Sequence, residues 1–320
     1  MKQLMPPFFS ICIPAYERVN YLRRLLDSIA EQTFRDFEVI ISDDSKTDQV
    51  LALVKAYSDK LTIRYFQNSP SLGTPSNWNN AISKAAGQWI KLIHDDDWFA
   101  SRDSLKKFAE NAHEQSPFVF SAYANHFEAG HLKPEIKRLS PAWSRRIIRQ
   151  PMALLAYNVI GPPSVTLIHR TVLEQYDPRF KWRVDMEFYV RLIKELNRFK
   201  YIDEILVNVG VSESQVTQSC IYQPTVELPE GLLLLRKHGD KPLDNVWVYD
   251  AWWRLLRNME IFTLEKLEQY TNEPWPAIIQ QMVIDLAGIP AAFLKLGVLS
   301  KAFMFASYLK NKSLISHPVS

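Results

Sequence analysis

Three consecutive aspartates, Asp95, Asp96 and Asp97, are the residues of this sequence best suited to chemistry, and His94 precedes them. They follow an apolar run, residues 89–93, that predicts a short buried strand. Like charges ~4 Å apart repel by roughly 4 kcal/mol at an effective dielectric constant of about 20. A hard cation such as Mg²⁺ or Mn²⁺ compensates that repulsion and can also hold substrate phosphates. The alternative is a solvated turn that favours the start of the next helix, and the triplet alone does not decide between the two.

Two further turns place polar or aromatic side chains at the ends of predicted strands. The turn residues are Pro14, Tyr16, Glu17 and Arg18 after the first strand and Asp43 and Asp44 after the second. Ligand sites of α/β sheets lie at the carboxyl ends of the strands, so we expect both turns to lie at the same sheet edge as the triplet.

Tyr16 and Asp44 suggest a nucleotide base as the ligand. The Tyr16 ring offers a face on which a base can stack. A carboxylate at Asp44 can accept the ring N–H of uracil, thymine or guanine, a donor that neutral adenine and cytosine lack. The alternatives are an aromatic at the edge of the core for Tyr16 and a turn with a helix cap for Asp43 and Asp44. The convergence of all three turns favours the nucleotide.

The elements that must position these turns alternate between strand and helix over residues 9–127. The predicted strands are residues 9–13, 38–42, 62–67, 89–93 and 118–123. Apolar residues at i, i+3, i+4 and i+7 predict helices around Leu22–Ile29 and Leu105–Ala112. Such alternation implies an α/β fold with a mostly parallel sheet flanked by helices. No GxGxxG or GxxxxGK[ST] motif occurs, which disfavours dinucleotide redox chemistry and P-loop hydrolysis.

Composition sets broader limits. With 320 residues, 47% of them hydrophobic, the chain can bury a substantial core. A net charge of +3 gives no strong field for a polyanion, so we expect no nucleic-acid partner. Cys12 and Cys220 lack metal-like spacing and are interpreted as reduced thiols of a cytoplasmic protein. Prolines interrupt the amino-terminal apolar run, and no apolar stretch reaches the ~20 residues of a membrane span.

Two stretches, SICIPAYERVNYLRRLLDSIAEQTFRDFEVIISDDSKTD and then AAGQWIKLIHDDDW, resemble the inverting family-two glycosyltransferases of the GT-A fold. The resemblance covers about residues 8 to 217. It implies a nucleotide-diphosphate sugar donor of the UDP, dTDP or GDP type, a glycan or lipid-linked glycan acceptor, and Mn²⁺ or Mg²⁺. Tyr16 resembles the base-stacking position and Asp44 the base-reading carboxylate. In HDD, which resembles the DxD motif, Asp96 resembles the metal ligand and Asp95 the contact to donor sugar or ribose.

The sequence departs from the family pattern at three positions. His94 stands where the first aspartate of DxD is usual. Trp78 stands where many relatives carry an arginine, next to Asn79 on the donor side. Ser212 takes the place of a histidine that often joins the metal site. The predicted donor-binding residues are Pro14, Tyr16, Glu17, Asp43, Asp44, Asn79, His94 and Asp95.

The stretch KWRVDMEFYVRLIKEL predicts a helix with Asp185 at its amino-terminal end. The resemblance implies that Asp185 is the general base. The alternative is an acid in the first helical turn that contributes ~1 kcal/mol to helix stability. Glu187 is the second candidate for the base.

We expect a catalytic domain in residues 1–225 and a helical region in residues 226–320. Residues 128–160 are basic and broken by prolines, and we expect a partly mobile loop over the site followed by a short helix. The aromatics Trp247, Trp252, Trp253 and Phe262 favour a packed core over an acceptor groove. The last helix is apolar with lysines, which favours packing on the catalytic domain or a second subunit over a membrane surface.

The predicted reaction is a single displacement at the anomeric carbon that inverts its configuration. Substitution of Asp185 or of Asp96 tests this prediction. We expect the reaction to serve the assembly of a surface polysaccharide or glycan. We expect the protein in the cytoplasm, with the inner face of the membrane as the other setting. A sugar nucleotidyltransferase is one alternative, although PAYER lacks the glycine-rich basic loop of such enzymes. A non-catalytic nucleotide-sugar-binding protein of the same fold is the other.

Overall fold

The computed structural model describes residues 6–128, 132–212, 220–239 and 241–316. The chain divides into two compact units. The first comprises Met1–Ile148 and Val159–Glu213, and the second comprises Arg149–Asn158 and Ser214–Ser320. The predicted division into residues 1–225 and 226–320 stays a prediction.

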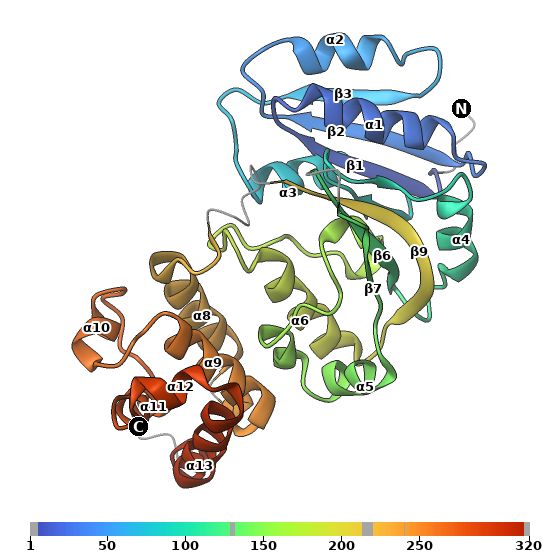
Figure 1. The fold of residues 1–320 in the computed structure, drawn as a ribbon. Helices are drawn as coiled ribbons and strands as arrows, with labels where there is room; N and C mark the ends of the chain where they lie inside the picture. The colour runs from blue at the N-terminus through green and yellow to red at the C-terminus, as the bar shows by residue number, and fades with distance from the viewer. Residues whose placement is uncertain (1–5, 129–131, 213–219, 240, 317–320) are drawn as a thin grey trace. The chain divides into compact units, whose positions relative to one another are not determined.

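A nine-stranded sheet is the centre of the first unit (Figure 1). The strand order is β3-β2-β1-β4-β8-β6-β9-β5, with β7 paired to β6. The strands are β1 (Phe9–Ala15), β2 (Phe37–Asp43), β3 (Ile63–Gln67), β4 (Trp89–Leu92), β5 (Trp98–Phe99), β6 (Phe118–Phe127), β7 (Glu135–Lys137), β8 (Thr166–His169) and β9 (Lys200–Val211). Strands β1 to β4 pair in parallel, as do β6 and β9, while β8 is antiparallel to both of its neighbours. The predicted α/β class with a mostly parallel sheet of the GT-A type is confirmed.

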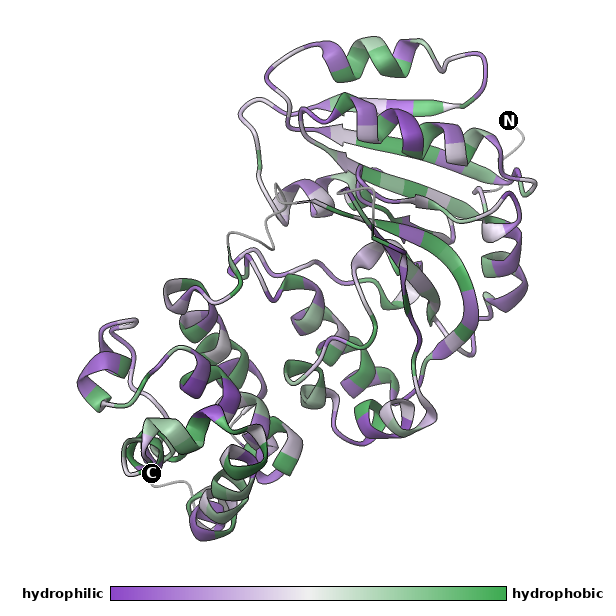
Figure 2. Cartoon of the chain, viewed as in Figure 1, coloured by the Kyte–Doolittle hydropathy of each residue, from purple (hydrophilic) through white to green (hydrophobic). Residues whose placement is uncertain are grey.

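Helices flank this sheet because each has one apolar side. They are α1 (Val19–Ala30), α2 (Gln49–Lys55), α3 (Ser76–Ser83), α4 (Ser104–Asn111), α5 (Pro141–Arg149) and α6 (Val184–Leu196). Helix α1 buries Leu22, Leu25, Leu26 and Ile29, which recur at the spacing of one helical face. Figure 2 shows largely hydrophobic residues along β1 and β2 and both kinds on α1. The four buried side chains of α1 belong to the same core cluster as buried residues of β1 and β2.

Strand register brings the predicted turns to one sheet edge. Ala15, the last residue of β1, lies opposite Asp43, the last of β2. Cys12 of β1 lies opposite Leu92 of β4, and the Ile93 N–H donates to the Cys12 carbonyl at 3.0 Å. The turns after β1, β2 and β4 therefore leave the sheet side by side.

The predicted loop over residues 128–160 contains regular structure. Strand β7 and helix α5 lie within it, followed by a 3₁₀-helix, η1 (Pro151–Leu155). Helix α5 agrees with the short helix expected there. Residues 129–131, which belong to the predicted loop, lie outside the described residues.

The second unit is helical in the part that the structure describes. Its helices are α8 (Pro224–His238), α9 (Val246–Asn258), α10 (Leu264–Glu268), α11 (Ala277–Ala287), α12 (Ala291–Lys295) and α13 (Gly297–Ser316). Trp252 and Trp253 are buried, so these aromatics pack a core. Across the described ranges, no helix combines the length and the apolar character that crossing a bilayer requires.

Candidate active site

The acidic loop, residues 94–97, follows β4 and buries all three of its carboxylates. Its turn is closed by the Asp97 N–H, which donates to the His94 carbonyl at 3.2 Å. A solvated turn, the alternative reading of the triplet, would leave these side chains in water. Their burial means that each charge must be compensated by the protein or by a ligand.

One arginine compensates two of the carboxylates. Arg18 Nη2 lies 2.8 Å from Asp95 Oδ1, and Arg18 Nη1 lies 2.8 Å from Asp96 Oδ2. Burial nevertheless raises the pKa of Asp95 to about 7, against the attraction of Arg18. A further cation near the loop would favour the ionised form of Asp95.

His94, Asp96 and Asp97 form a group that fits a divalent cation. One candidate ligand atom from each residue lies within 4.8 Å of the others. His94 Nε2 is buried and finds no hydrogen-bond partner within the described ranges. Burial lowers the pKa of His94 to about 4, so the imidazole is neutral at pH 7 and its lone pair is available to a metal. A nitrogen with two carboxylates suits Mn²⁺ better than Mg²⁺, which prefers an all-oxygen shell.

A backbone N–H of β9 holds the third aspartate. The Gly210 N–H of β9 donates to Asp97 Oδ1 at 3.0 Å, and burial raises the pKa of Asp97 well above its usual value. Below the loop, the buried Lys91 ammonium donates to the carbonyls of Ser164 and Thr166. Burial lowers the pKa of Lys91 to about 7, which makes Lys91 a weak source of compensating charge.

The turn after β1 places Tyr16 at the acidic loop. Its backbone N–H donates to Asp95 Oδ2 at 3.4 Å, and its side chain is 50% exposed. The ring is therefore free to meet a ligand beside the loop. Glu17 has a positive φ of 58° and joins the two turns, because its N–H donates to Ser45 Oγ at 2.7 Å and its carboxylate accepts from the Lys46 N–H at 2.8 Å.

The aspartates after β2 are buried and hold their surroundings in place. Asp44 accepts hydrogen bonds from Asn68 Nδ2 at 2.8 Å, from the Leu72 N–H at 3.0 Å and from the Gly73 N–H at 2.8 Å. A carboxylate has about four acceptor positions, so one remains for a ligand. Asp43 accepts from the Tyr65 hydroxyl at 2.7 Å. The base-reading role of Asp44 stays a prediction.

Asn79 and Pro14 act within the protein in this structure. The Asn79 amide exchanges two hydrogen bonds with the Tyr176 backbone, at 2.8 and 2.9 Å. Its neighbour Trp78 packs on the His94 ring, with centroids 4.7 Å apart. Pro14 is buried in β1 opposite Ser42. Trp78 thus supports the imidazole of a candidate metal ligand, whereas the donor contacts predicted for Asn79 and Pro14 stay predictions.

Asp185 lies in the first turn of α6, half-buried. Its Oδ1 accepts from the Met186 N–H at 2.7 Å. Burial raises the pKa of the Tyr123 hydroxyl, and the charges of Asp185 and Asp97 add to this, so both carboxylates lie near one tyrosine. Glu187 is fully buried and pairs with Arg191 at 2.8 Å, which leaves Asp185 as the more accessible acid of the two.

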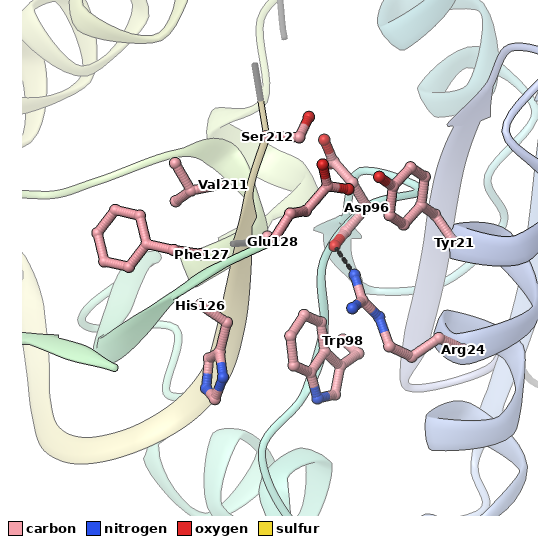
Figure 3. Close-up of a pocket in the computed structure, with 10 residues that line it drawn as sticks. Tyr21, Arg24, Asp96, Trp98, His126, Phe127, Glu128, Val211 and Ser212 are labelled. Atoms are coloured by element: carbon pink, nitrogen blue, oxygen red, sulfur yellow. Dashed lines mark hydrogen bonds between the residues drawn. The ribbon is translucent and has the colours of Figure 1, made fainter. Parts of the chain in front are cut away.

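A cavity of about 410 Å³ opens beside Asp96 (Figure 3). Figure 3 shows Asp96, Glu128 and Ser212 gathered at one end and Arg24 over the Trp98 ring at the other. Arg24 Nη2 donates to the Asp96 carbonyl at 2.6 Å, and its guanidinium carbon lies 3.6 Å from the Trp98 centroid. Ser212, at the position where relatives often carry a histidine, therefore lies beside Asp96. The volume suits a small-molecule ligand.

Sequence patterns missed several residues of this site. Arg18 was noted only as part of a turn, and Arg24, Gly210 and Ser164 were not singled out. Arg18 lies in the same turn as Tyr16, directly after β1, and this position was the one feature of the sequence that could have indicated its role. The other residues that contact the acidic loop come from segments far apart in the chain, so no local sequence spacing predicts them.

A sheet edge that gathers buried carboxylates, an exposed aromatic ring and a candidate cation site is typical of an α/β protein of the GT-A type. Residues 10–177 match the family described as Glycosyl transferase family 2. The chain belongs to that family.

Similar proteins agree with this assignment. Poly(ribitol-phosphate) beta-N-acetylglucosaminyltransferase TarS of Staphylococcus aureus is 35% identical over 104 residues, which are 32% of this chain and 18% of TarS. The chondroitin synthase of Pasteurella multocida is 28% identical over 206 residues, 63% of this chain and 20% of the synthase. The chain thus spans about a fifth of the length of these relatives.

Solved structures share the fold. Residues 1–349 of S. aureus TarS, crystallised with UDP-GlcNAc, superpose with a TM-score of 0.61 and 20% identity over 96% of this chain and 91% of that one. The mannosyltransferase PcManGT from Pyrobaculum calidifontis, in complex with GDP-Man and Mn²⁺, gives a TM-score of 0.55 and 15% identity over 96% and 87% of the two chains.

Proposed function

We propose that this protein is a metal-dependent inverting glycosyltransferase that moves a sugar from a nucleotide-diphosphate donor to a hydroxyl of a glycan or lipid-linked glycan. The observation that carries the proposal is the buried group of His94, Asp96 and Asp97 at the sheet edge where Tyr16 is exposed. These three residues would hold the cation, which would act as a Lewis acid and neutralise charge on a leaving diphosphate. The ligands of the solved relatives, UDP-GlcNAc for TarS and GDP-Man with Mn²⁺ for PcManGT, support this choice of donor and metal.

The residues of the three turns each contact a different part of the donor in this proposal. Tyr16 stacks on the base, and the remaining acceptor position of Asp44 takes a ring N–H. Asp95 accepts a hydroxyl of the ribose or of the donor sugar. Arg18, which bridges Asp95 and Asp96, lies where it can turn toward phosphate oxygens, which a planar guanidinium binds in pairs.

Asp185 accepts the proton of the acceptor hydroxyl. The hydroxyl oxygen forms a bond to the anomeric carbon while the bond from that carbon to the diphosphate breaks, and the diphosphate leaves with the electron pair. Attack from the face opposite the nucleotide inverts the configuration. The half-buried position of Asp185 supports this role, because a base must reach its substrate.

The test compares Asp185→Asn with the wild type. Loss of the base lowers turnover by roughly 10²- to 10⁴-fold while donor affinity stays unchanged. Release of nucleoside diphosphate measures transfer, whereas release of pyrophosphate would identify a nucleotidyltransferase. Asp203→Asn, at an exposed carboxylate of β9, is the matched control and should keep full activity. Full turnover in Asp185→Asn would remove the assignment.

A further inference from the structure

Helices α12 and α13 of the second unit present large apolar side chains to solvent. We name this set the α12–α13 surface: Phe293 (44% exposed), Leu296 (55%), Val298 (85%), Phe305 (50%) and Leu309 (57%). Several large apolar side chains exposed on neighbouring helices are typical of a surface that meets a partner.

The exposed side chains of α13 lie on the side of the helix that faces away from the core of the second unit. Val298, Phe305 and Leu309 recur at i, i+7 and i+11, which places them on one side of α13. The opposite side is packed and satisfied: Met304 and Tyr308 are buried, and the Tyr308 hydroxyl donates to the Asp244 carbonyl at 2.6 Å. Helix α13 is therefore held in place by one face and leaves the other for a partner.

The charged residues that this segment itself supplies are basic. Residues 286–320 contain no aspartate or glutamate, whereas Lys295, Lys301, Lys310 and Lys312 are exposed. Two of these lysines are paired with acids from other segments, Lys310 with Asp285 at 2.7 Å and Lys312 with Asp244 at 3.9 Å. Within the described part of the chain, Lys295 and Lys301 form no ion pair and flank the apolar side chains. Apolar residues interspersed with lysines are typical of helices that lie on anionic membranes.

We propose that the α12–α13 surface binds peripherally to an anionic lipid bilayer. Phe305, Leu309 and Val298 enter the boundary between headgroups and acyl chains, while Lys295 and Lys301 lie against lipid phosphates. A symmetric dimer through the same surface is disfavoured, because it would bring Lys295 and Lys301 of two copies together, and neither lysine has an acidic partner among the described residues.

The test is flotation of the full chain with vesicles of phosphatidylcholine alone and of phosphatidylcholine with phosphatidylglycerol. The wild type should float only with the anionic vesicles, and less at high salt. Each lysine near such a surface contributes about 1 kcal/mol, so Lys295→Gln with Lys301→Gln should lower partitioning by roughly tenfold or more. Phe305→Ser with Leu309→Ser should lower it as well.

The control is Lys55→Gln with Lys60→Gln, the same charge change at exposed lysines of the first unit, and it should float like the wild type. Circular dichroism and thermal unfolding show that each variant is folded. Equal flotation of the lysine pair and its control would overturn the proposal, as would a wild type that ignores anionic vesicles. Self-association in sedimentation velocity that Phe305→Ser with Leu309→Ser abolishes would assign the surface to a second copy instead.

Discussion

The residues of the acidic loop differ in charge state and in hydrogen bonding, and both properties determine which ligand they can bind. Asp95 and Asp97 are buried with raised pKa values, while His94 is neutral and its Nε2 has no hydrogen-bond partner among the described residues. Arg18 pairs with both Asp95 and Asp96. A divalent cation suits all of these residues together, because it binds ionised carboxylates and a neutral imidazole.

The pKa of Asp95 predicts how metal stabilisation depends on pH. Its folded-state pKa of about 7 lies above the unfolded value, so its ionisation lowers the stability of the metal-free protein as pH rises through about 7. Mn²⁺ binds the ionised loop and should therefore raise the melting temperature more at pH 8 than at pH 6. Differential scanning fluorimetry measures both increments. Asp95→Asn should narrow the difference, and equal increments in the wild type would contradict the argument.

Elements control how closely the acidic loop is held. Strand β9 approaches the loop so tightly that a Cβ on Gly210 would lie 2.5 Å from the Asp96 carbonyl oxygen. The nearest atom belongs to the backbone and cannot move aside as a flexible side chain would, and Arg24 Nη2 lies 3.3 Å from the same Cβ position. The spacing of β9 and the loop is therefore part of the site.

Gly210→Ala tests this spacing. The substitution should destabilise the protein by about 1–3 kcal/mol through overpacking and should weaken Mn²⁺ binding because the loop must shift. Chemical denaturation and calorimetric titration measure the two effects. Gly288→Ala is the control, since its new Cβ would meet its nearest neighbour at an ordinary 3.6 Å. Unchanged metal affinity in Gly210→Ala would show that β9 does not position the loop.

Elements also show where sequence patterns succeed. The continuous apolar runs of β1, β2 and β4 predict buried parallel strands, and the turns after them were expected at one edge, as found. Strand β9 escaped prediction because Asp203 and Glu204 interrupt its apolar residues, and both are exposed. Short β5 has only two residues and no pattern of its own. The long-range partners of the carboxylates, Arg18 and Gly210, follow from tertiary packing that no local spacing encodes.

The whole molecule combines two kinds of surface in separate units. The first unit carries the acidic loop at the sheet edge where the turns after β1, β2 and β4 meet. The second unit carries the α12–α13 surface, which is apolar and contains exposed lysines. The match to glycosyl transferase family 2 covers residues 10–177, which belong to the first unit except for residues 149–158. Donor chemistry and membrane binding can therefore be measured independently, and failure of one leaves the other standing.

The most direct measurement is isothermal titration of UDP- and GDP-sugars into the full chain with and without Mn²⁺, repeated with Asp96→Ala. At least one donor should bind in the presence of Mn²⁺, and chelation or Asp96→Ala should weaken that binding by about tenfold or more. Asp203→Asn should bind like the wild type. Donor binding of equal strength with and without metal, in both the wild type and Asp96→Ala, would contradict the account.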